Sequence, residues 1–264
     1  MDNCYIITKL KQTLNYQPST NMPSIRVENI SKRYGTFTAL DGVSFAVERG
    51  ELFGLIGPDG AGKTTLFRLL TTLMLPDGGS ATVDGLDIVT DYKSIRQIVG
   101  YMPGRFSLYQ DLSVEENLEF FASLFGTTIA EGYDLIAPIY RQIEPYKMRR
   151  AGRLSGGMKQ KLALSCALVH KPRVLFLDEP TTGVDAVSRS EFWDMLHTLR
   201  QHGITILVST PYMDEASRCD RIALINEGKI LRIDTPDRIA DEGATLEDTF
   251  IRLIQEEYGK HHIG

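Results

Sequence analysis

The chain has 264 residues, of which 42% are hydrophobic and 24% are charged, which excludes a mainly disordered, collagen-like or coiled-coil protein. The formal net charge of −5 argues against a protein held by the phosphate backbone of nucleic acid, so we expect no nucleic-acid partner. The three cysteines are widely spaced. They predict neither a disulfide framework nor a zinc cluster, and they favour a reducing, cytosolic compartment.

No run of apolar residues approaches the roughly 18 that a membrane-spanning helix needs. The N-terminus also lacks the apolar centre of a signal peptide. We therefore expect a chain that is not secreted and does not cross a membrane by itself, although it can dock on a membrane protein. Residues 1–23 are polar and without pattern, which predicts a poorly ordered tail, and we expect a second tail at 259–264.

From residue 25 onward the hydrophobic pattern predicts strands that alternate with helices, an arrangement typical of an α/β fold with a mainly parallel sheet. The expected strands cover 25–30, 38–40, 43–47, 52–56, 82–83, 98–101, 174–177 and 204–209, followed by a hairpin of 222–226 and 229–233. The expected helices cover 64–75, 114–125, 156–169, 187–201 and 246–257, and 216–218 ends a further short helix.

The helix expected at 114–125 has a clear start signal. Ser113 precedes it and Glu116 follows three residues later, which is the pattern of a capping box. Residues 127–152 have a weaker pattern, because Gly132, Pro138 and Pro145 interrupt it.

A glycine-rich segment joins the apolar run 52–56 to the helical pattern at 64–75, and it matches the phosphate-loop pattern G-x-x-x-x-G-K-[S/T]. Glycines let backbone N–H groups turn toward phosphate oxygens, and the following helix presents its positive end. In this pattern Lys63 reaches the β- and γ-phosphates and Thr64 places its hydroxyl on Mg²⁺. The alternative is a glycine-rich turn with an incidental lysine. The candidate nucleotide-binding residues here are Gly57, Pro58, Asp59, Gly60, Ala61, Gly62, Lys63, Thr64 and Thr65.

Two carboxylates end the apolar strand expected at 174–177. A phosphate–Mg²⁺ site needs one carboxylate near the metal and can use another to activate water. Asp178 fits the first role, acting on the metal through water, and Glu179 fits the second, as the catalytic base. Acidic residues often end strands, so this pair indicates a nucleotide site only together with the phosphate loop upstream.

A third motif lies between these two halves of the site. Leu154-Ser155-Gly156-Gly157-Met158 opens the helix expected at 156–169 and resembles the signature of the ATP-binding cassette (ABC) family. Tyr34-Gly35 resembles the aromatic loop that stacks on adenine, and Gly183-Val184-Asp185 resembles the D-loop. The alternatives are a capped helix start with a glycine pair, and for Tyr34 an apolar strand edge. The resemblance covers about 25–254, and 246–250 resemble the closing helix of cassettes that serve ABC-2-type exporters.

This resemblance implies a P-loop NTPase of the ABC cassette type, with a mainly parallel core sheet, an antiparallel β subdomain and an α-helical arm. The cassette would span 24–258, and the arm at about 105–155 would couple to a transmembrane permease subunit. Family members pair head to tail with a second cassette, so Ser155, Gly156 and Gly157 would act on the partner's ATP. The implied cofactors are ATP and Mg²⁺. The implied location is cytoplasmic, peripheral on the cytoplasmic face of the cell membrane, as part of an exporter.

Two positions depart from the family pattern. Gly104 stands where the family carries Gln in a Tyr-x-Pro-Gln context, and its flanks exclude Gln110 as a shifted equivalent. Pro211 stands where the family carries a switch His, and His202 lies at the opposite end of the strand expected at 204–209. The family uses both side chains around the attacking water, and neither glycine nor proline offers a side-chain donor. Their loss predicts ATP binding with slow hydrolysis at this chain's own site.

Two interpretations of these departures stay open. One is a working ATPase with an unusual local solution, since Glu179 is retained. The other, which we favour, is one half of a heterodimer that holds its own ATP and completes the site of its partner. A soluble ABC ATPase without a membrane partner and a non-hydrolysing ATP-responsive scaffold are the alternative functions. The family often has Asn in place of Asp59, and we expect this carboxylate to face solvent or to cap the turn.

Overall fold

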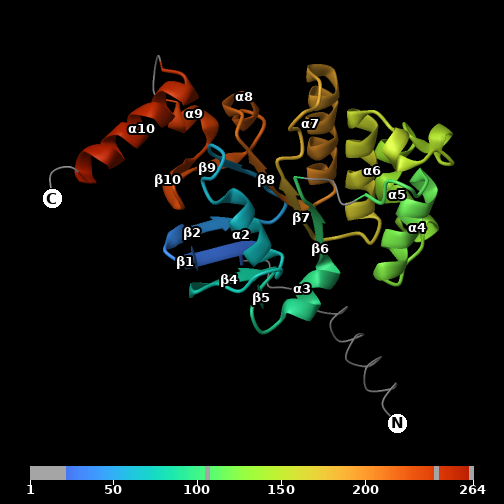
Figure 1. Cartoon of the computed structure of the whole chain (residues 1–264), viewed down its shortest axis with the longest axis horizontal. Coiled ribbons are helices and arrows are strands. Elements are labelled where there is room, and N and C mark those ends of the chain that lie inside the picture. Colours follow the sequence, from blue (N-terminus) through green and yellow to red (C-terminus); the bar gives the residue numbers. More distant parts are fainter. Residues whose placement is uncertain (1–21, 105–107, 241–243, 262–264) are drawn as a thin grey trace, which may run out of the picture.

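The computed structural model of the chain describes residues 22–104, 108–240 and 244–261, the last four by their backbone alone. The N-terminal tail expected at 1–23 lies outside the described residues except for its last two, and so do 262–264 of the expected C-terminal tail. Figure 1 shows two sheets near the middle of the molecule, the helices α4, α5 and α6 together at one end, and α10 at the other.

The core sheet has six strands in the order β10-β9-β3-β8-β7-β6. Neighbouring strands from β9 to β6 are parallel, whereas β10 pairs antiparallel with β9. Every residue of β3, β7 and β8 is buried, because both faces of the sheet are covered. The mainly parallel α/β sheet predicted from the sequence is confirmed. Its strands are β3 (Leu52–Ile56), β6 (Val99–Met102), β7 (Val174–Asp178), β8 (Thr205–Thr210), β9 (Arg221–Asn226) and β10 (Lys229–Asp234).

A second, antiparallel sheet has the order β2-β1-β4-β5. The prediction of separate strands at 38–40 and 43–47 is wrong, because β2 continues through both segments. Gly42 lies between them with a φ of +67°, and the register of β1 against β2 shifts there. The strand therefore bends at an irregular pairing without ending. This sheet consists of β1 (Ile25–Tyr34), β2 (Phe37–Val47), β4 (Gly78–Val83) and β5 (Leu86–Asp87).

The helices pack on both sides of the core sheet. One apolar cluster joins the antiparallel sheet and α2 to the core sheet, and the ring of Phe67 meets that of Phe176 edge to face within it. The other joins the core sheet to α6 and α7, with α4 and α5 packed on α6. The helices are α2 (Lys63–Leu70), α3 (Tyr92–Ile98), α4 (Val114–Leu124), α5 (Ile129–Tyr140), α6 (Gly156–Leu168), α7 (Ala186–Gln201), α8 (Met213–Ala216), α9 (Pro236–Ile239) and α10 (Leu246–His261), with short 3-10 turns at Glu144–Tyr146 and Ala151–Arg153.

The helix that follows the phosphate loop is shorter than predicted. The leucine spacing predicts a helix over 64–75, but α2 ends at Leu70. Thr72 adopts a φ of +61°, a left-handed conformation that ends the helical backbone, and Leu73 is 59% exposed as a result. The helix α3, which has two turns and Ile95 as its buried residue, was not predicted from the sequence.

The helix α5 forms where the pattern is weak. Thr128 and Glu131 make a capping box at its start, as Ser113 and Glu116 do for α4, where the prediction is confirmed. Gly132 brings α5 close to the end of α6, because a Cβ at this position would collide with the carbonyl oxygen of Val169. Pro138 lies in the last turns of the helix. Gly132 and Pro138 are therefore accommodated by close packing and by the helix end, and Pro145 lies beyond the helix in the 3-10 turn Glu144–Tyr146.

Candidate nucleotide-binding site

The phosphate loop connects β3 to α2 and is pressed against neighbouring backbone. The N–H of Gly57 donates to the carbonyl oxygen of Thr210 at 3.3 Å, which ties the start of the loop to the end of β8. Gly62 has a φ of +103°, and a Cβ there would lie 2.5 Å from the carbonyl oxygen of Ala39. The position therefore needs glycine both for its conformation and for the close approach of β2.

Lys63 is 3% exposed and points back into the loop. Its Nζ donates to the carbonyl oxygens of Gly57 at 2.7 Å and Pro58 at 2.8 Å. The same ammonium lies 3.1 Å from Oε1 of Glu179. The structure thus brings the lysine of the phosphate loop into contact with the predicted catalytic base, and it fixes a positive charge where the loop turns.

The two predicted carboxylates lie at the end of β7 in different environments. Asp178 is 2% exposed and its Oδ1 accepts a hydrogen bond from Oγ of Ser209 at 2.8 Å. Burial and the nearby Asp178 raise the pKa of Tyr101 to about 12. Glu179 has a φ of +49°, and its N–H donates to the carbonyl oxygen of Ser209 at 3.1 Å and to its Oγ at 3.0 Å. Such a φ in a residue other than glycine is uncommon and is found at functional sites.

Lys63 and Glu179 line one cleft of about 210 Å³, whereas Asp178 is not among its lining residues. Tyr34 lines it and is 44% exposed, with its hydroxyl 3.1 Å from Sδ of Met74. Phe37, which the sequence analysis misses, lines the same cleft and is 60% exposed. Its spacing across the turn from Tyr34 is the signal that could have found it, since the two residues pair between β1 and β2. The lining residues are Tyr34, Phe37, Ala39, Gly60, Gly62, Lys63, Thr64, Thr65 and Glu179.

Four of the predicted phosphate-loop residues do not line this cleft, and the first of them, Gly57, is buried. Pro58 and Asp59 are exposed, which agrees with the expectation that the Asp59 carboxylate faces solvent, and Ala61 is buried. Ala61 accepts a hydrogen bond from the N–H of Gly228 at 3.0 Å, so it anchors the loop to the β9–β10 turn.

The signature residues lie elsewhere. Ser155 caps α6, and its Oγ accepts from the N–H of Met158 at 3.4 Å. Ser155 and Gly156 are exposed, and a Cβ on Gly157 would lie 2.7 Å from Oγ of Ser188 in α7. None of the three signature residues lines the cleft among the residues that the structure describes. The structure therefore does not bring them to this chain's own phosphate loop.

One departure from the family pattern, Gly104, lies beside the acidic pair, and the other, Pro211, follows the end of the neighbouring strand β8. A Cβ on Gly104 would lie 3.0 Å from the carbonyl oxygen of Asp178 and 3.9 Å from Cβ of Glu179. Pro211 directly follows Thr210, whose carbonyl oxygen accepts from Gly57. The side-chain amide and the imidazole that the family carries at positions 104 and 211 are therefore lacking at the edge of the core sheet that carries Glu179.

The oxygen donors of this site fit Mg²⁺ better than a softer metal. Thr64 is half-buried at the start of α2, and Asp178 is buried at the end of β7. Within the described ranges, no group of three or more His, Cys, Asp or Glu side chains is placed to hold a metal ion. Two oxygen donors together with phosphate oxygens and water are a typical ligand set for Mg²⁺.

No helix in the described part of the chain has the length and apolar character needed to span a bilayer.

The chain is similar in sequence and in fold to known proteins. Residues 40–182 match the family model described as ABC transporter. The probable multidrug ABC transporter ATP-binding protein YbhF of Escherichia coli K12 is 42% identical over 250 residues, covering 90% of this chain and 43% of that protein. The chain thus spans less than half the length of this relative.

A second relative, the Nod factor export ATP-binding protein I of Burkholderia orbicola, is 42% identical over 208 residues, which cover 78% of this chain and 68% of that protein. A solved structure of the ATP-binding subunit of an ABC transporter matches with a TM-score of 0.79 at 30% identity. That match covers 87% of this chain and 99% of the solved one.

Proposed function

We propose, from the premise that this chain belongs to the ABC transporter family, that it is the ATP-binding subunit of an exporter. It would couple ATP binding and hydrolysis to transport through a separate transmembrane subunit. The names of two relatives, a probable multidrug ABC transporter ATP-binding protein and a Nod factor export protein, support this direction of transport. The observation that carries the ATP site is the buried ammonium of Lys63, held against Glu179 in a cleft that Tyr34 also lines.

In this proposal the loop amides and Lys63 bind the triphosphate, and Tyr34 stacks on the base. Thr64 and Asp178 hold Mg²⁺, the latter through water. Bound Mg·ATP supplies the phosphoanhydride bond whose hydrolysis drives transport. Lys63 neutralises phosphate charge, and phosphate oxygens compete with Glu179 for its ammonium. Glu179 is then free to accept a proton from the attacking water.

An apolar groove supports the proposal that the chain docks on a transmembrane subunit. It measures about 400 Å³ and lies between α3 and β6 on one side and α4 and α6 on the other. Leu73 and Leu124 line it and are 59% and 58% exposed, so the groove continues into exposed apolar side chains, as interaction sites do. We place a helical segment of the transmembrane subunit in this groove, at the cytoplasmic face of the membrane. The groove is lined by Thr71, Leu73, Arg96, Gln97, Val99, Tyr101, Met102, Pro103, Leu108, Phe121, Leu124, Phe125, Ala163, Cys166, Ala167 and His170.

A second cassette is the other partner in this proposal. The signature, of which Ser155 and Gly156 are exposed and Gly157 is half-buried, lies outside this chain's own cleft, so it is available to the ATP of a partner. The α6 helix presents its N-terminal N–H groups there, and these stabilise phosphate charge. Because Gly104 and Pro211 weaken the chain's own site, the favoured partner is a different cassette whose own catalytic residues are complete.

Steady-state hydrolysis by the purified chain tests this proposal. Turnover of Mg·ATP is compared with that of Glu179→Gln, and ATP affinity is measured separately, with Lys63→Ala as the variant that loses binding. Tight binding with slow turnover that still exceeds that of Glu179→Gln supports an ATP-holding half of a heterodimer. Ordinary turnover that needs Glu179 indicates a self-sufficient ATPase, and absence of ATP binding contradicts the proposal.

A non-hydrolysing ATP-responsive scaffold is the second candidate, and Gly104 and Pro211 are the observations that favour it. Mixing with the partner cassette separates the two functions. The exporter subunit restores ATP turnover at the composite site formed with its signature, whereas the scaffold responds to ATP by pairing without turnover.

A further inference from the structure

The turn that follows β7 is held by buried polar side chains that the proposed function does not use. Gln160 of α6 is fully buried, and its Nε2 donates to the carbonyl oxygen of Pro180 at 2.8 Å. Thr181 is 2% exposed, and its Oγ1 donates to Oε2 of Glu215 at 3.1 Å. Since Pro180 and Thr181 directly follow Glu179, both contacts act on the segment that carries the base.

Glu215 joins this turn to the end of the neighbouring strand. It lies in α8 and is 3% exposed. The same Oε2 atom accepts a second hydrogen bond, from Oγ1 of Thr210 at 2.6 Å. Thr210 ends β8, and its Oγ1 also accepts from the N–H of Tyr212 at 3.1 Å. One buried carboxylate oxygen therefore ties the turn after β7 to the turn that carries Pro211.

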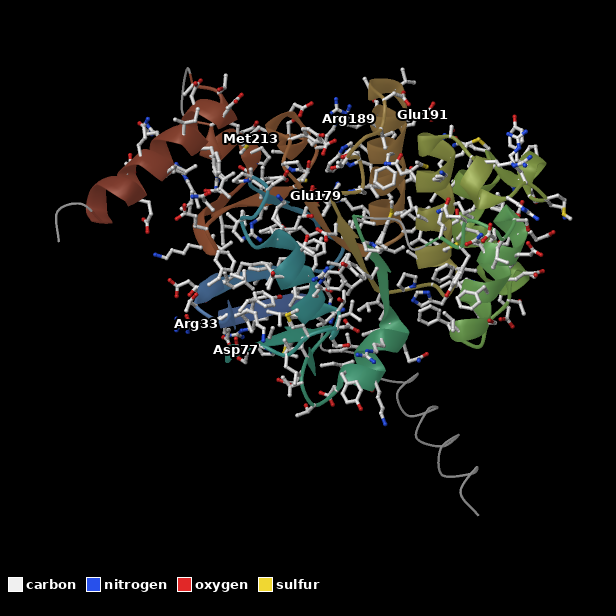
Figure 2. All side chains as sticks on the ribbon, viewed as in Figure 1. Arg33, Asp77, Glu179, Arg189, Glu191 and Met213 are labelled. Atoms are coloured by element: carbon white, nitrogen blue, oxygen red, sulfur yellow. The ribbon has the colours of Figure 1, made fainter. Side chains whose placement is uncertain are left out.

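The other carboxylate oxygen of Glu215 faces the start of α7. Nε of Arg189 lies 3.9 Å from Oε1, and the Arg189 guanidinium lies 5.2 Å from the ring centroid of Tyr212. Glu179 and Arg189 are labelled in Figure 2, on the turn after β7 and on α7. A buried carboxylate is destabilising unless hydrogen bonds and a nearby cation compensate it. Oε2 accepts two hydrogen bonds, whereas Oε1 has no hydrogen-bond partner among the described residues and only Arg189 at ion-pair distance.

The backbone conformation of Glu179 is one that the surrounding hydrogen bonds have to hold in place. Its φ of +49° is sparsely populated for a residue with a side chain and persists only where the surroundings impose it. The N-terminal side of the turn is fixed by the bonds from Glu179 N–H to Ser209. The C-terminal side is fixed by Gln160 and by Glu215. Loss of either side would let the peptide rotate and move the carboxylate away from the cleft.

We propose that Glu215 is a positioning residue for Glu179, acting through Thr181 and Thr210. The buried carboxylate holds the turn so that the base faces the cleft that Lys63 also lines. This inference rests on the proposed function, because it assigns Glu215 to the base of that reaction. The role is distinct from ATP binding, since Glu215 does not line the cleft among the described residues.

Threonine variants test the proposal with little change of shape. Thr181→Val removes the hydroxyl that donates to Glu215, and Thr181→Ser keeps it. Thr249→Val is the matched control, because Thr249 is 1% exposed in α10 and its hydroxyl has no hydrogen-bond partner among the described residues. Three quantities are measured: the Kd for Mg·ATP, the single-turnover hydrolysis rate with the chain in excess, and hydrogen–deuterium exchange of the 178–184 segment without nucleotide.

We expect Thr181→Val to bind Mg·ATP within about twofold of the wild type, while its hydrolysis rate falls about tenfold. This is less than the hundredfold or more lost with a direct transition-state contact, because Thr181 acts on the base only through the turn. Exchange in the 178–184 segment rises at the same time, with no change in α2. Thr181→Ser restores rate and protection, and Thr249→Val matches the wild type. If Thr181→Val does not fold, Thr210→Val tests the same contact independently, and we expect it to keep the Kd for Mg·ATP and to lower the hydrolysis rate.

Other results overturn the inference. A Thr181→Val chain that hydrolyses ATP at the wild-type rate excludes positioning through Glu215. A wild-type rate no higher than that of Glu179→Gln also excludes it, because there is then no acting base to position. Both leave ATP binding intact, so they are distinguishable from failure of the proposed function, in which the wild-type chain binds no ATP.

Discussion

Tyr34 and Phe37 are two aromatic residues that face each other across the β1–β2 turn and line the nucleotide cleft. The hairpin is held in place, because Asp77 accepts from Nζ of Lys32 at 2.9 Å and from the N–H of Arg33 at 2.7 Å. Arg33 and Asp77 are labelled in Figure 2. Phe37 is 60% exposed, and a stacked base would cover part of its ring.

Phe37→Ala should therefore weaken ATP binding while leaving the binding of inorganic triphosphate unchanged. Stacking of a base on an aromatic ring contributes about 1–3 kcal/mol, so we expect a Kd for ATP about tenfold higher. Calorimetric titration with both ligands makes the comparison, and Phe37→Tyr is the control that keeps a ring. Equal loss of affinity for ATP and triphosphate would show that Phe37 supports the loop and does not contact the base.

Restoring the family's histidine at position 211 tests the interpretation that this chain's own site hydrolyses ATP slowly. Pro211 follows Thr210 at the end of β8, and an imidazole there would add a donor near the phosphate loop. Pro211→His should raise Glu179-dependent hydrolysis up to about a hundredfold, because one transition-state contact of this type contributes about 3 kcal/mol. Steady-state ATPase assays with Pro211→His and Pro211→Ala separate the gain of a donor from the loss of proline. Equal rates in the two variants would contradict this interpretation.

At the scale of elements, strong periodicity predicted most of what positions the site, and packing decided the rest. The strands at 52–56 and 174–177 were predictable because strands covered on both faces form continuous apolar runs. The extent of α2 was not, since leucines at helical spacing continue past Thr72, whose backbone ends the helix. The helix α5 was not predictable either. Gly132 looks like an interruption in the sequence, and only the folded structure shows that it packs against the carbonyl group of Val169.

His170 follows α6 and links that helix to β6, where one ring nitrogen lies 3.0 Å from the carbonyl oxygen of Val99. Its ring stacks on that of Phe125, with centroids 3.6 Å apart. Burial lowers the pKa of His170 from 6.5 to about 4. The neutral ring donates from Nε2 to Val99, and a second proton would go to Nδ1, which is buried and has no hydrogen-bond partner in the described part of the chain.

This pKa predicts a pH dependence of stability. Between about pH 6.5 and 4 the unfolded chain binds a proton that the folded chain excludes, so the free energy of unfolding falls as pH falls through that window. Urea unfolding at pH 7.5 and pH 5.0 should therefore show a larger drop for the wild type than for His170→Gln, which cannot titrate. Parallel drops in the two proteins would place the acid sensitivity elsewhere.

At the scale of the whole molecule, the nucleotide cleft and the signature belong to two different surfaces. The cleft groups residues from the antiparallel sheet, the phosphate loop and the turn after β7. The signature caps α6 beside the start of α7, where Gly157 adjoins Ser188. The sequence motifs predicted part of the cleft, including Tyr34, Lys63 and Glu179, but not Phe37. They could not predict from spacing alone that the signature lies apart, because that depends on how α6 packs against α7.

Ser155→Asp should therefore separate this chain's own binding from its effect on a partner. Aspartate caps a helix as well as serine does, so α6 should keep its start and the chain its Tm. Because Ser155 does not line the cleft, the Kd of this chain for ATP should stay within about twofold. Turnover with the partner cassette should fall at least a hundredfold, since a carboxylate would oppose the γ-phosphate. These quantities are measured by thermal unfolding, nucleotide titration and ATPase assays of the paired cassettes. A weaker Kd with unchanged paired turnover would mean that the signature serves its own chain.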